Sequence, residues 1–200
     1  MTALEAALRA IAVDLGNAHV GFALIGGLAV SARTEPRFTR DADLAVAVAS
    51  DAEAEALSRE LQRRGYRIET LVEQDAVGRL ATVRLTRSRG AENPVTDLLF
   101  ASSGIEPEVV ADAEMIELLP QLSIRVATIG HLIALKVLSR DDVRRPQDLA
   151  DLRALLRVVS PAEIARARTA IRLITERGYN RGRDLQSDME KLLRAERGQA

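Results

Sequence analysis

Apolar side chains recur every three or four positions in the first sixteen residues, at Leu4, Leu8, Ile11 and Leu15. This spacing predicts an amphipathic helix over residues 2–16. The same period returns over 51–65, and an acidic segment over 105–114 is interpreted as a further helix. The first two segments end near a glycine, which is a common helix stop.

Between these helices lie short apolar or alternating segments that are bounded by Gly, Pro and polar residues, a pattern typical of strands. They are 20–25, 42–48, 66–72, 80–86, 95–100 and a pair within 115–126 that turns at Pro120. Gly26 and Gly27 connect the first strand to a brief helix over 28–32. The next segment, 34–40, contains Pro36 and is predicted to be a loop.

From residue 128 onward the apolar pattern becomes helical throughout. Helices are predicted over 129–138, from Pro146, from Pro161 and over 184–193, since proline is well suited to the first position of a helix. The fold class is therefore expected to be α+β, with a mixed sheet and flanking helices over 1–127. A helical C-terminal lobe is expected over 128–200, packed on that core.

Composition narrows the choice of protein class. Apolar residues make up 47% of the 200 residues, as in ordinary globular proteins, whereas aromatic residues make up only 2%. So few rings argue against a single-strand binding module that stacks bases on aromatic platforms. Cysteine is absent, which excludes disulfides and thiolate metal sites. The N-terminal segment resembles neither a signal peptide nor a membrane span, so we expect a cytoplasmic protein without membrane contact.

The charge is nearly balanced overall, at −1, but it is unevenly distributed. Residues 90–120 contain acids and no base, and basic segments lie on either side of them. Such a surface could hold nucleic acid near carboxylates, although solvated helix faces explain the same counts. Of the 28 basic residues only Lys136 and Lys191 are lysine, so each invites a chemical explanation.

Two acids, Asp41 and Asp43, lie in an otherwise apolar predicted strand shortly after the glycine pair. Residues i and i+2 of a strand point to the same face, roughly 7 Å apart, so both carboxylates can converge on one cation. Mg²⁺ suits them, because it takes oxygen ligands from one or two carboxylates and from substrate phosphates. Gly26 and Gly27 allow close backbone approach, and the helix that follows offers N–H groups to a phosphate. A D-x-D motif alone would be weak evidence for a metal site, and a Gly-Gly turn alone would be weak evidence for a phosphate site.

Asp97 adds a third acid, in a strand-like run where its same-face neighbours are Val95 and Leu99. Burial of a lone carboxylate is unfavourable, and a metal or a proton would relieve it. Asp97 could thus act as a general base toward an attacking hydroxyl or bind a metal. The alternative is an acid on an edge strand that reaches solvent.

The run GGLAVSARTEPRFTRDADLAV resembles the signature of the polymerase-beta-like nucleotidyltransferase superfamily. Its R-x-T-x-D-x-D-L form, made by Arg37, Thr39, Asp41, Asp43 and Leu44, is most similar to the AbiEii/AbiGii toxin-type branch. Members of this branch carry a third acid on a later strand, to which the acid at position 97 corresponds by position and context.

A second run, LIALKVLSRDDVRRPQDLADLRAL, is similar to the pattern of an apolar helix with a lysine followed by R-x-K-D-x-x-D-L. Lys136, Arg145, Asp148 and Asp151 match, whereas Gln147 stands where the family often has lysine. The resemblance covers about residues 20 to 156, and the last 45 residues are not assigned by it.

The resemblance implies a mixed, mostly antiparallel nucleotidyltransferase sheet. It also implies transfer of a nucleoside monophosphate from an NTP to an acceptor hydroxyl, with release of pyrophosphate. The expected cofactor is Mg²⁺, with Mn²⁺ as an alternative. The acceptor is expected to be RNA such as tRNA, a protein or a small molecule. If the chain is the toxin of a toxin-antitoxin pair, a cognate antitoxin protein is a further partner.

The expected roles follow from the matched positions. The metal ligands are Asp41, Asp43 and Asp97, which together with Lys136 form the expected catalytic set. The expected nucleotide-binding residues are Gly26, Gly27, Arg37, Thr39, Arg40, Lys136 and Asp148.

Several of these roles have alternatives. Lys136 is a compact point charge suited to phosphate, or else a lysine that extends from a helix edge into solvent. Asp148 and Asp151 fix Lys136 or Arg145 by ion pairing, contact the nucleotide, or are solvated. The competing function is a non-catalytic nucleotide-binding or interaction protein from an operon pair. The departure at Gln147 and the unassigned tail favour it, and the three acids argue against it.

Overall fold

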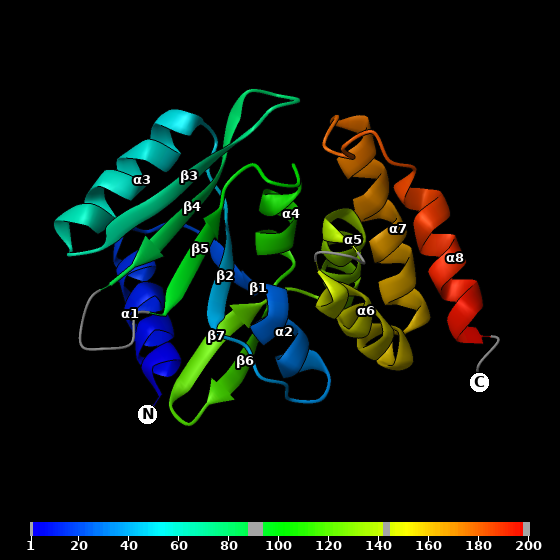
Figure 1. The fold of residues 1–200 in the computed structure, drawn as a ribbon. Coiled ribbons are helices and arrows are strands. Elements are labelled where there is room, and N and C mark those ends of the chain that lie inside the picture. Colours follow the sequence, from blue (N-terminus) through cyan, green and yellow to red (C-terminus); the bar gives the residue numbers. More distant parts are fainter. Residues whose placement is uncertain (1, 88–93, 142–144, 198–200) are drawn as a thin grey trace.

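The computed structural model describes residues 2–87, 94–141 and 145–197 (Figure 1). Its helices are α1 (Ala3–Asn17), α2 (Gly26–Arg33), α3 (Asp51–Arg63), α4 (Glu106–Ala111), α5 (Ile129–Ser139), α6 (Pro146–Val158), α7 (Pro161–Glu176) and α8 (Leu185–Arg197). Its strands are β1 (Phe22–Ile25), β2 (Asp41–Val46), β3 (Arg67–Gln74), β4 (Arg79–Thr86), β5 (Val95–Leu99), β6 (Glu114–Leu119) and β7 (Leu122–Val126). Every helix and strand predicted from the sequence has a counterpart here.

The seven strands form one sheet in the order β3-β4-β5-β2-β1-β7-β6. The β1–β2, β3–β4, β4–β5 and β6–β7 pairs are antiparallel, and the β1–β7 and β2–β5 pairs are parallel. The sheet is therefore mixed and mostly antiparallel, and the predicted α+β class is confirmed. The two central strands, β2 and β5, are those that carry the predicted acids.

Side-chain alternation along the central strands separates an apolar face from a face that carries acids. Leu24 lies opposite Leu44, and Leu44 lies beside Leu98, and all three side chains are fully buried. Because strand residues alternate between faces, Asp43 and Asp97 point the other way. Figure 1 shows α2 and α4 on the acidic side of the sheet and α1 on the apolar side.

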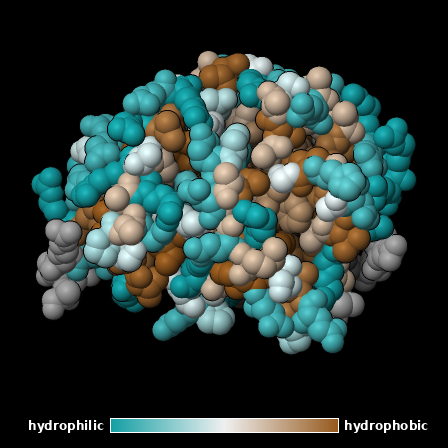
Figure 2. Space-filling view, turned by 180° about the vertical axis from the view of Figure 1, so that it is seen from behind, coloured by the Kyte–Doolittle hydropathy of each residue, from teal (hydrophilic) through white to brown (hydrophobic). Residues whose placement is uncertain are grey.

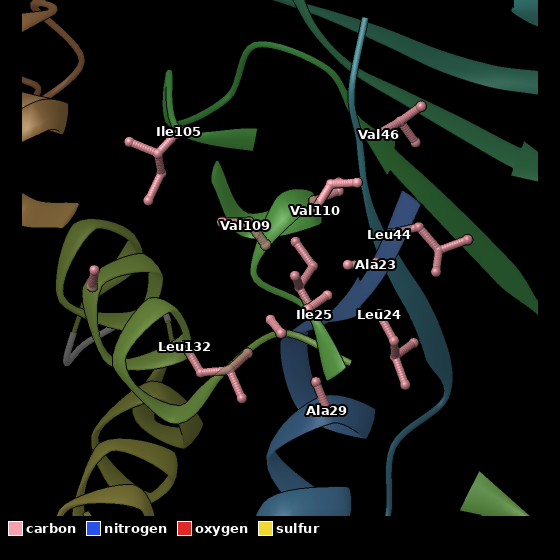
Figure 3. Packing of buried hydrophobic residues seen from close by; sticks show 14 of the residues in the cluster. Ala23, Leu24, Ile25, Ala29, Leu44, Val46, Ile105, Val109, Val110 and Leu132 are labelled. Carbon is pink, nitrogen blue, oxygen red and sulfur yellow. The ribbon is translucent and has the colours of Figure 1, made fainter. Parts of the chain in front are cut away.

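The C-terminal helices pack on the acidic side through a core that is continuous with the sheet. Figure 3 shows side chains from β1, α4 and α5 meeting there, among them Ile25, Val109 and Leu132. Helices α5 and α7 approach closely at Gly130, where an added Cβ would lie 2.5 Å from the Glu163 carbonyl oxygen. The division of the chain into 1–127 and 128–200 stays a prediction, although α5 does begin just after residue 128.

Seen from behind, the surface mixes hydrophilic and hydrophobic residues, so that brown patches are interrupted by teal side chains (Figure 2). Large exposed apolar side chains in the chain include Val13, Leu71, Val72 and Met115. Within the described ranges, every helix is too short or too polar to cross a membrane.

Candidate active site

The two strands at the centre of the sheet bring the three predicted acids to one face. Asp43 on β2 lies directly beside Asp97 on β5 in the parallel register, and Asp41 is two residues earlier on β2. Neighbouring strands are about 4.8 Å apart, so the side chains of a register pair are immediate neighbours. Strand β2 begins at Asp41 and ends at Val46, rather than covering 42–48, and both acids therefore lie within the strand.

Gly26 brings the backbone against the Asp43 carboxylate. A Cβ at this glycine would lie 1.9 Å from Asp43 Oδ2, and its φ of +64° belongs to the left-handed region that favours glycine. Gly26 and Gly27 are themselves the first residues of α2, whereas the sequence predicted the helix only from residue 28. The start of α2 is thus in direct contact with the acid on the neighbouring strand.

The Asp43 carboxylate lies in surroundings that disfavour its charge. Burial, together with the nearby charges of Asp97 and Asp41, raises its pKa to about 6, although Lys136 and Arg145 act in the opposite direction. In the part of the chain that the structure describes, neither Asp41 nor Asp43 forms a side-chain hydrogen bond or ion pair. A cation between these carboxylates would relieve both the repulsion and the loss of solvation.

Asp97 is paired with an arginine that the sequence interpretation missed. Arg84 on β4 donates from Nε to Asp97 Oδ1 at 2.9 Å and from Nη2 to Oδ2 at 2.7 Å. Strand β5 lies between β4 and β2, so Asp97 is 8% exposed and is not on an edge strand. The sequence did contain a clue to Arg84. In the predicted strand 80–86 the residues alternate, so Arg84 lies on the face opposite Ala81, Val83 and Leu85.

Lys136 on α5 lies within a buried ionic cluster. Its Nζ is 2.7 Å from Asp148 Oδ1 and 2.8 Å from Asp151 Oδ2, and the three side chains are at most 10% exposed. Ser139 and Arg145 also contact Asp148. Of the alternatives for Asp148 and Asp151, the structure shows ion pairing, and Lys136 does not extend into solvent.

The cluster reaches the loop between α2 and β2 through Arg37. This guanidinium donates from Nε and Nη2 to the two oxygens of Asp151, at 2.6 and 2.8 Å. It also lies against Gly27, where an added Cβ would be 2.6 Å from Arg37 Nη2 and 3.1 Å from Thr39 Oγ1. The first motif and the second motif are therefore joined by a bidentate ion pair.

Arg40 lies apart from this cluster. It is exposed, and its guanidinium stacks 5.6 Å from the centre of the Phe38 ring, whose residue is 80% exposed. Beside it, a hollow of about 960 Å³ extends from Asp41 and the 36–40 loop to the start of α1 and the end of β6. Asp41, at the edge of the acidic site, thus lines an open and largely apolar space.

The donor set is compatible with a divalent cation, although it is not assembled as a cage. Across the described residues, no three His, Cys, Asp or Glu side chains form a ready metal-binding group. Asp97 is not free to complete such a group, because Arg84 binds both of its oxygens. Asp41 and Asp43 remain as two hard oxygen donors on one face, which is a pattern that Mg²⁺ uses together with substrate phosphates.

Comparisons with solved structures identify the fold. One match is the crystal structure of an antigenic nucleotidyltransferase-like protein from Paracoccidioides brasiliensis, with 18% identity and a TM-score of 0.54 over 96% of this chain and 92% of the other. Another is the crystal structure of ANT(2")-Ia in complex with adenylyl-2"-tobramycin, with 16% identity and a TM-score of 0.55 over 86% and 98%. At these identities the likeness concerns the fold. No curated protein sequence matches significantly.

The fold, with acids on its two central strands, is similar to that of nucleotidyltransferase-like proteins. The family model described as the nucleotidyl transferase AbiEii toxin of type IV toxin-antitoxin systems matches residues 7–199. The chain therefore belongs to the AbiEii nucleotidyltransferase family. The match also includes the C-terminal residues that the sequence motifs left unassigned.

Proposed function

We propose that this protein transfers a nucleoside monophosphate from an NTP to an acceptor hydroxyl in a Mg²⁺-dependent reaction, with Mn²⁺ as an alternative ion. The observation that supports this most directly is the register of Asp43 beside Asp97, with Gly26 against the Asp43 carboxylate. These contacts place the acids next to the N-terminus of α2. That arrangement suits a polyphosphate bridged by a cation, since helix N-terminal amides attract anions.

In this proposal Asp41 and Asp43 hold the metal, and Asp97 is the third ligand or the proton acceptor. The metal ion, when bound, neutralises charge on the attacking and leaving oxygens. The acceptor oxygen forms a bond to the α-phosphorus, the bond to the bridging oxygen breaks, and pyrophosphate leaves with that electron pair. Once its carboxylate is free of Arg84, Asp97 either binds the metal, in which case the hydroxyl proton passes to solvent, or takes that proton itself.

Lys136 is assigned a supporting role in this scheme. Because Asp148 and Asp151 hold its ammonium in a buried cluster, it contributes positive potential toward Asp43 and the triphosphate. Arg37 fixes the loop that leads into β2 through its bond to Asp151. Gly27 and Thr39 lie against that guanidinium, and they are proposed to shape the nucleotide side of the site.

The acceptor is proposed to be an RNA such as tRNA, a protein or a small molecule, and the chain is proposed to act as a toxin with a cognate antitoxin. The family description supports the toxin assignment, and the structural neighbour bound to an adenylylated antibiotic illustrates a small-molecule acceptor on the same fold. The hollow next to Asp41 offers space for an acceptor of any of these classes.

The test is transfer of label from each α-³²P NTP, with Mg²⁺, to total RNA, total protein and a small-molecule extract. We expect one fraction to be labelled and pyrophosphate to be released in equal amount. Asp43→Asn is expected to reduce transfer at least about 100-fold, since it removes charge at the metal and phosphates. Asp75→Asn, at an exposed turn between β3 and β4, is the matched control and is expected to retain activity.

Failure of all fractions to take up label, while a nucleotidyltransferase of known acceptor works in the same mixtures, would contradict the proposal. Growth arrest on expression provides an independent readout of the toxin assignment. We expect arrest with the wild-type chain and with Asp75→Asn, and normal growth with Asp43→Asn. Equal growth of all three strains at matched expression would count against the toxin.

A further inference from the structure

We infer that Arg84 is an exchangeable counter-ion of the acidic site: it occupies Asp97 while no nucleotide is bound and moves to the nucleotide phosphates when Asp97 turns to the metal. This inference rests on the proposed metal-dependent function. It assigns a role in nucleotide binding to a residue outside both sequence motifs.

The first support is the geometry of the pair. The guanidinium binds both oxygens of Asp97 through Nε and Nη2, so neither oxygen is left fully available to a metal. Strand register fixes the contact, because Arg84 lies directly opposite Asp97 in the antiparallel β4–β5 pair. Asp97 in turn lies beside Asp43 on the other side, in the parallel β2–β5 pair. Arg84 is therefore one strand further from the metal position than Asp97.

The second support is the difference in exposure between the partners. The Asp97 side chain is 12% exposed, whereas the Arg84 side chain is 47% exposed. Asp97 needs a positive partner in this environment, because an unpaired buried carboxylate is unfavourable. Arg84 can leave the pair without such a cost, since its long side chain already reaches solvent. Such an ion pair is stable without a ligand, and Arg84 can still exchange Asp97 for a phosphate.

The third support is the charge around the guanidinium. Its hydrogen bonds to Asp97 raise the pKa of Arg84, and the charges of Asp41 and Asp43 add to this effect. All three acids therefore act on one guanidinium on the same face of the sheet. When cations compensate the acids, this attraction weakens. A triphosphate bound at the same place then offers the oxygen pairs that a guanidinium binds in a bidentate manner.

The exchange predicts opposite effects of one substitution on two affinities. Arg84→Gln removes the competitor for Asp97, so the full-length protein without nucleotide should bind Mn²⁺ more tightly, by about tenfold. The same variant loses a phosphate contact, so its affinity for a non-hydrolysable NTP analogue with Mn²⁺ should fall by a similar factor. A purely structural role would move both affinities in the same direction or leave both unchanged.

The measurements are Mn²⁺ titrations by electron paramagnetic resonance and analogue titrations by calorimetry. Arg67→Gln is the matched control, because Arg67 pairs with Glu69 on the edge strand β3 and is 79% exposed. It removes the same charge away from the acids and should change neither affinity by more than about twofold. In an Asp97→Asn background, Arg84→Gln should lose most of its effect on Mn²⁺ affinity.

The outcomes separate this inference from the proposed function. If wild-type protein binds Mn²⁺ through Asp43 but Arg84→Gln leaves that affinity unchanged, the exchange is wrong and the metal site stands. If no Mn²⁺ binds with or without the analogue, both fail. Arg84→Lys keeps the charge but lacks the fork, so its Mn²⁺ affinity should lie between wild type and Arg84→Gln. This second variant provides the comparison should Arg84→Gln unfold.

Discussion

Gly26 determines where the carboxylate of Asp43 can lie. Its hydrogen atom faces Asp43 Oδ2 at a distance that leaves no room for a methyl group, and its backbone has a positive φ. Both constraints exclude other residues for independent reasons, one steric and one conformational. The glycine therefore contributes to the position of an acid that is seventeen residues away in the chain.

Gly26→Ala is expected to reduce nucleotidyl transfer at least about 100-fold and to lower the free energy of unfolding by about 1–3 kcal/mol. The added methyl group must displace the Asp43 side chain or shift the start of α2. Gly16→Ala is the control, because nothing lies within 4 Å of its added Cβ. That change in helix α1 should raise stability by about 0.5–1 kcal/mol and leave transfer unchanged. Comparable activity of both variants would contradict this assignment.

The ionisation of Asp43 gives a prediction for metal-free protein. Its pKa is raised from 3.8 to about 6, so the folded state binds this proton more tightly than the unfolded state. The stabilisation from that proton is fully present below about pH 4 and is lost as pH rises through 6. Asp43→Asn should therefore be more stable than wild type by about 1–2 kcal/mol at pH 8, with little difference at pH 4.

Urea unfolding in the presence of EDTA measures this difference. Because Asp43 is only partly buried, the expected stability difference is smaller than a pKa rise from 3.8 to about 6 would give for a fully buried group. Asp75→Asn, at an exposed position, should have the same free energy of unfolding as the wild type at each of the two pH values. A stability difference for Asp43→Asn that does not change with pH would show that its charge is not the cause.

Single residues also show what the sequence could and could not reveal. Asp41, Asp43 and Asp97 were found because acids in apolar strands need an explanation, and β2 and β5 do place them on one face. Arg84 was missed, because its importance depends on which strand pairs with β5. That pairing joins residues through a sheet register that local pattern does not encode. The pairing of Arg37 with Asp151 was hidden as well, because it joins a loop to a helix that is distant in the chain.

At the scale of elements, the loop before β2 and the helix α6 are held together by charge. Asp151 on α6 accepts from Arg37 on the loop and from Lys136 on α5, so one buried carboxylate joins three elements. The Asp151 side chain is 1% exposed, and removal of one partner from such a cluster leaves buried charge without compensation. The cluster thus fixes the entry to β2, on which both acids of the first motif lie.

A double-mutant cycle on Arg37→Ala and Asp151→Ala should give a coupling of about 1–3 kcal/mol in the free energy of unfolding. Asp151→Ala alone should cost about 3 kcal/mol, since Lys136 also loses a partner. The exposed i,i+4 pair of Glu55 and Arg59 on α3 is the control. Its cycle should give less than about 0.5 kcal/mol. Equal coupling in the two cycles would mean that the buried cluster does not hold the loop.

The existence and type of each element followed from the sequence because they depend on local periodicity and caps, whereas several boundaries, such as those of α2 and β2, moved by one or two residues. The helix of α1 begins with a capping box between Thr2 and Glu5, and α6 and α7 each begin at a proline. The order of strands in the sheet has no such local signal. Only the resemblance indicated a mostly antiparallel sheet, and the contacts between β7 and β1 or between α6 and the loop required coordinates.

At the scale of the whole molecule, one hydrophobic cluster extends from the sheet into the C-terminal helices. It includes Leu24 and Leu44 in the sheet, Leu132 on α5 and Ile171 on α7. Tyr179, which follows α7, packs against Gly104 just before α4, where an added Cβ would lie 2.5 Å from its ring. Shared burial of this kind couples the unfolding of the two parts, because neither can open without exposing the other.

We therefore expect a single cooperative thermal transition, which the two tyrosines of the chain can report. Tyr66 lies beside β3 and Tyr179 beside α7, so Tyr66→Phe and Tyr179→Phe variants each leave one ultraviolet probe in a different part. Gly130→Val should push α5 from α7 and lower the transition by about 4–8 °C, for a cost of about 2 kcal/mol. Introduced into both tyrosine variants, it should lower the midpoint at the two probes equally. If the transition midpoint falls at Tyr179 but not at Tyr66, the helical lobe unfolds independently. The site between the sheet and the helices would then open before the sheet itself unfolds.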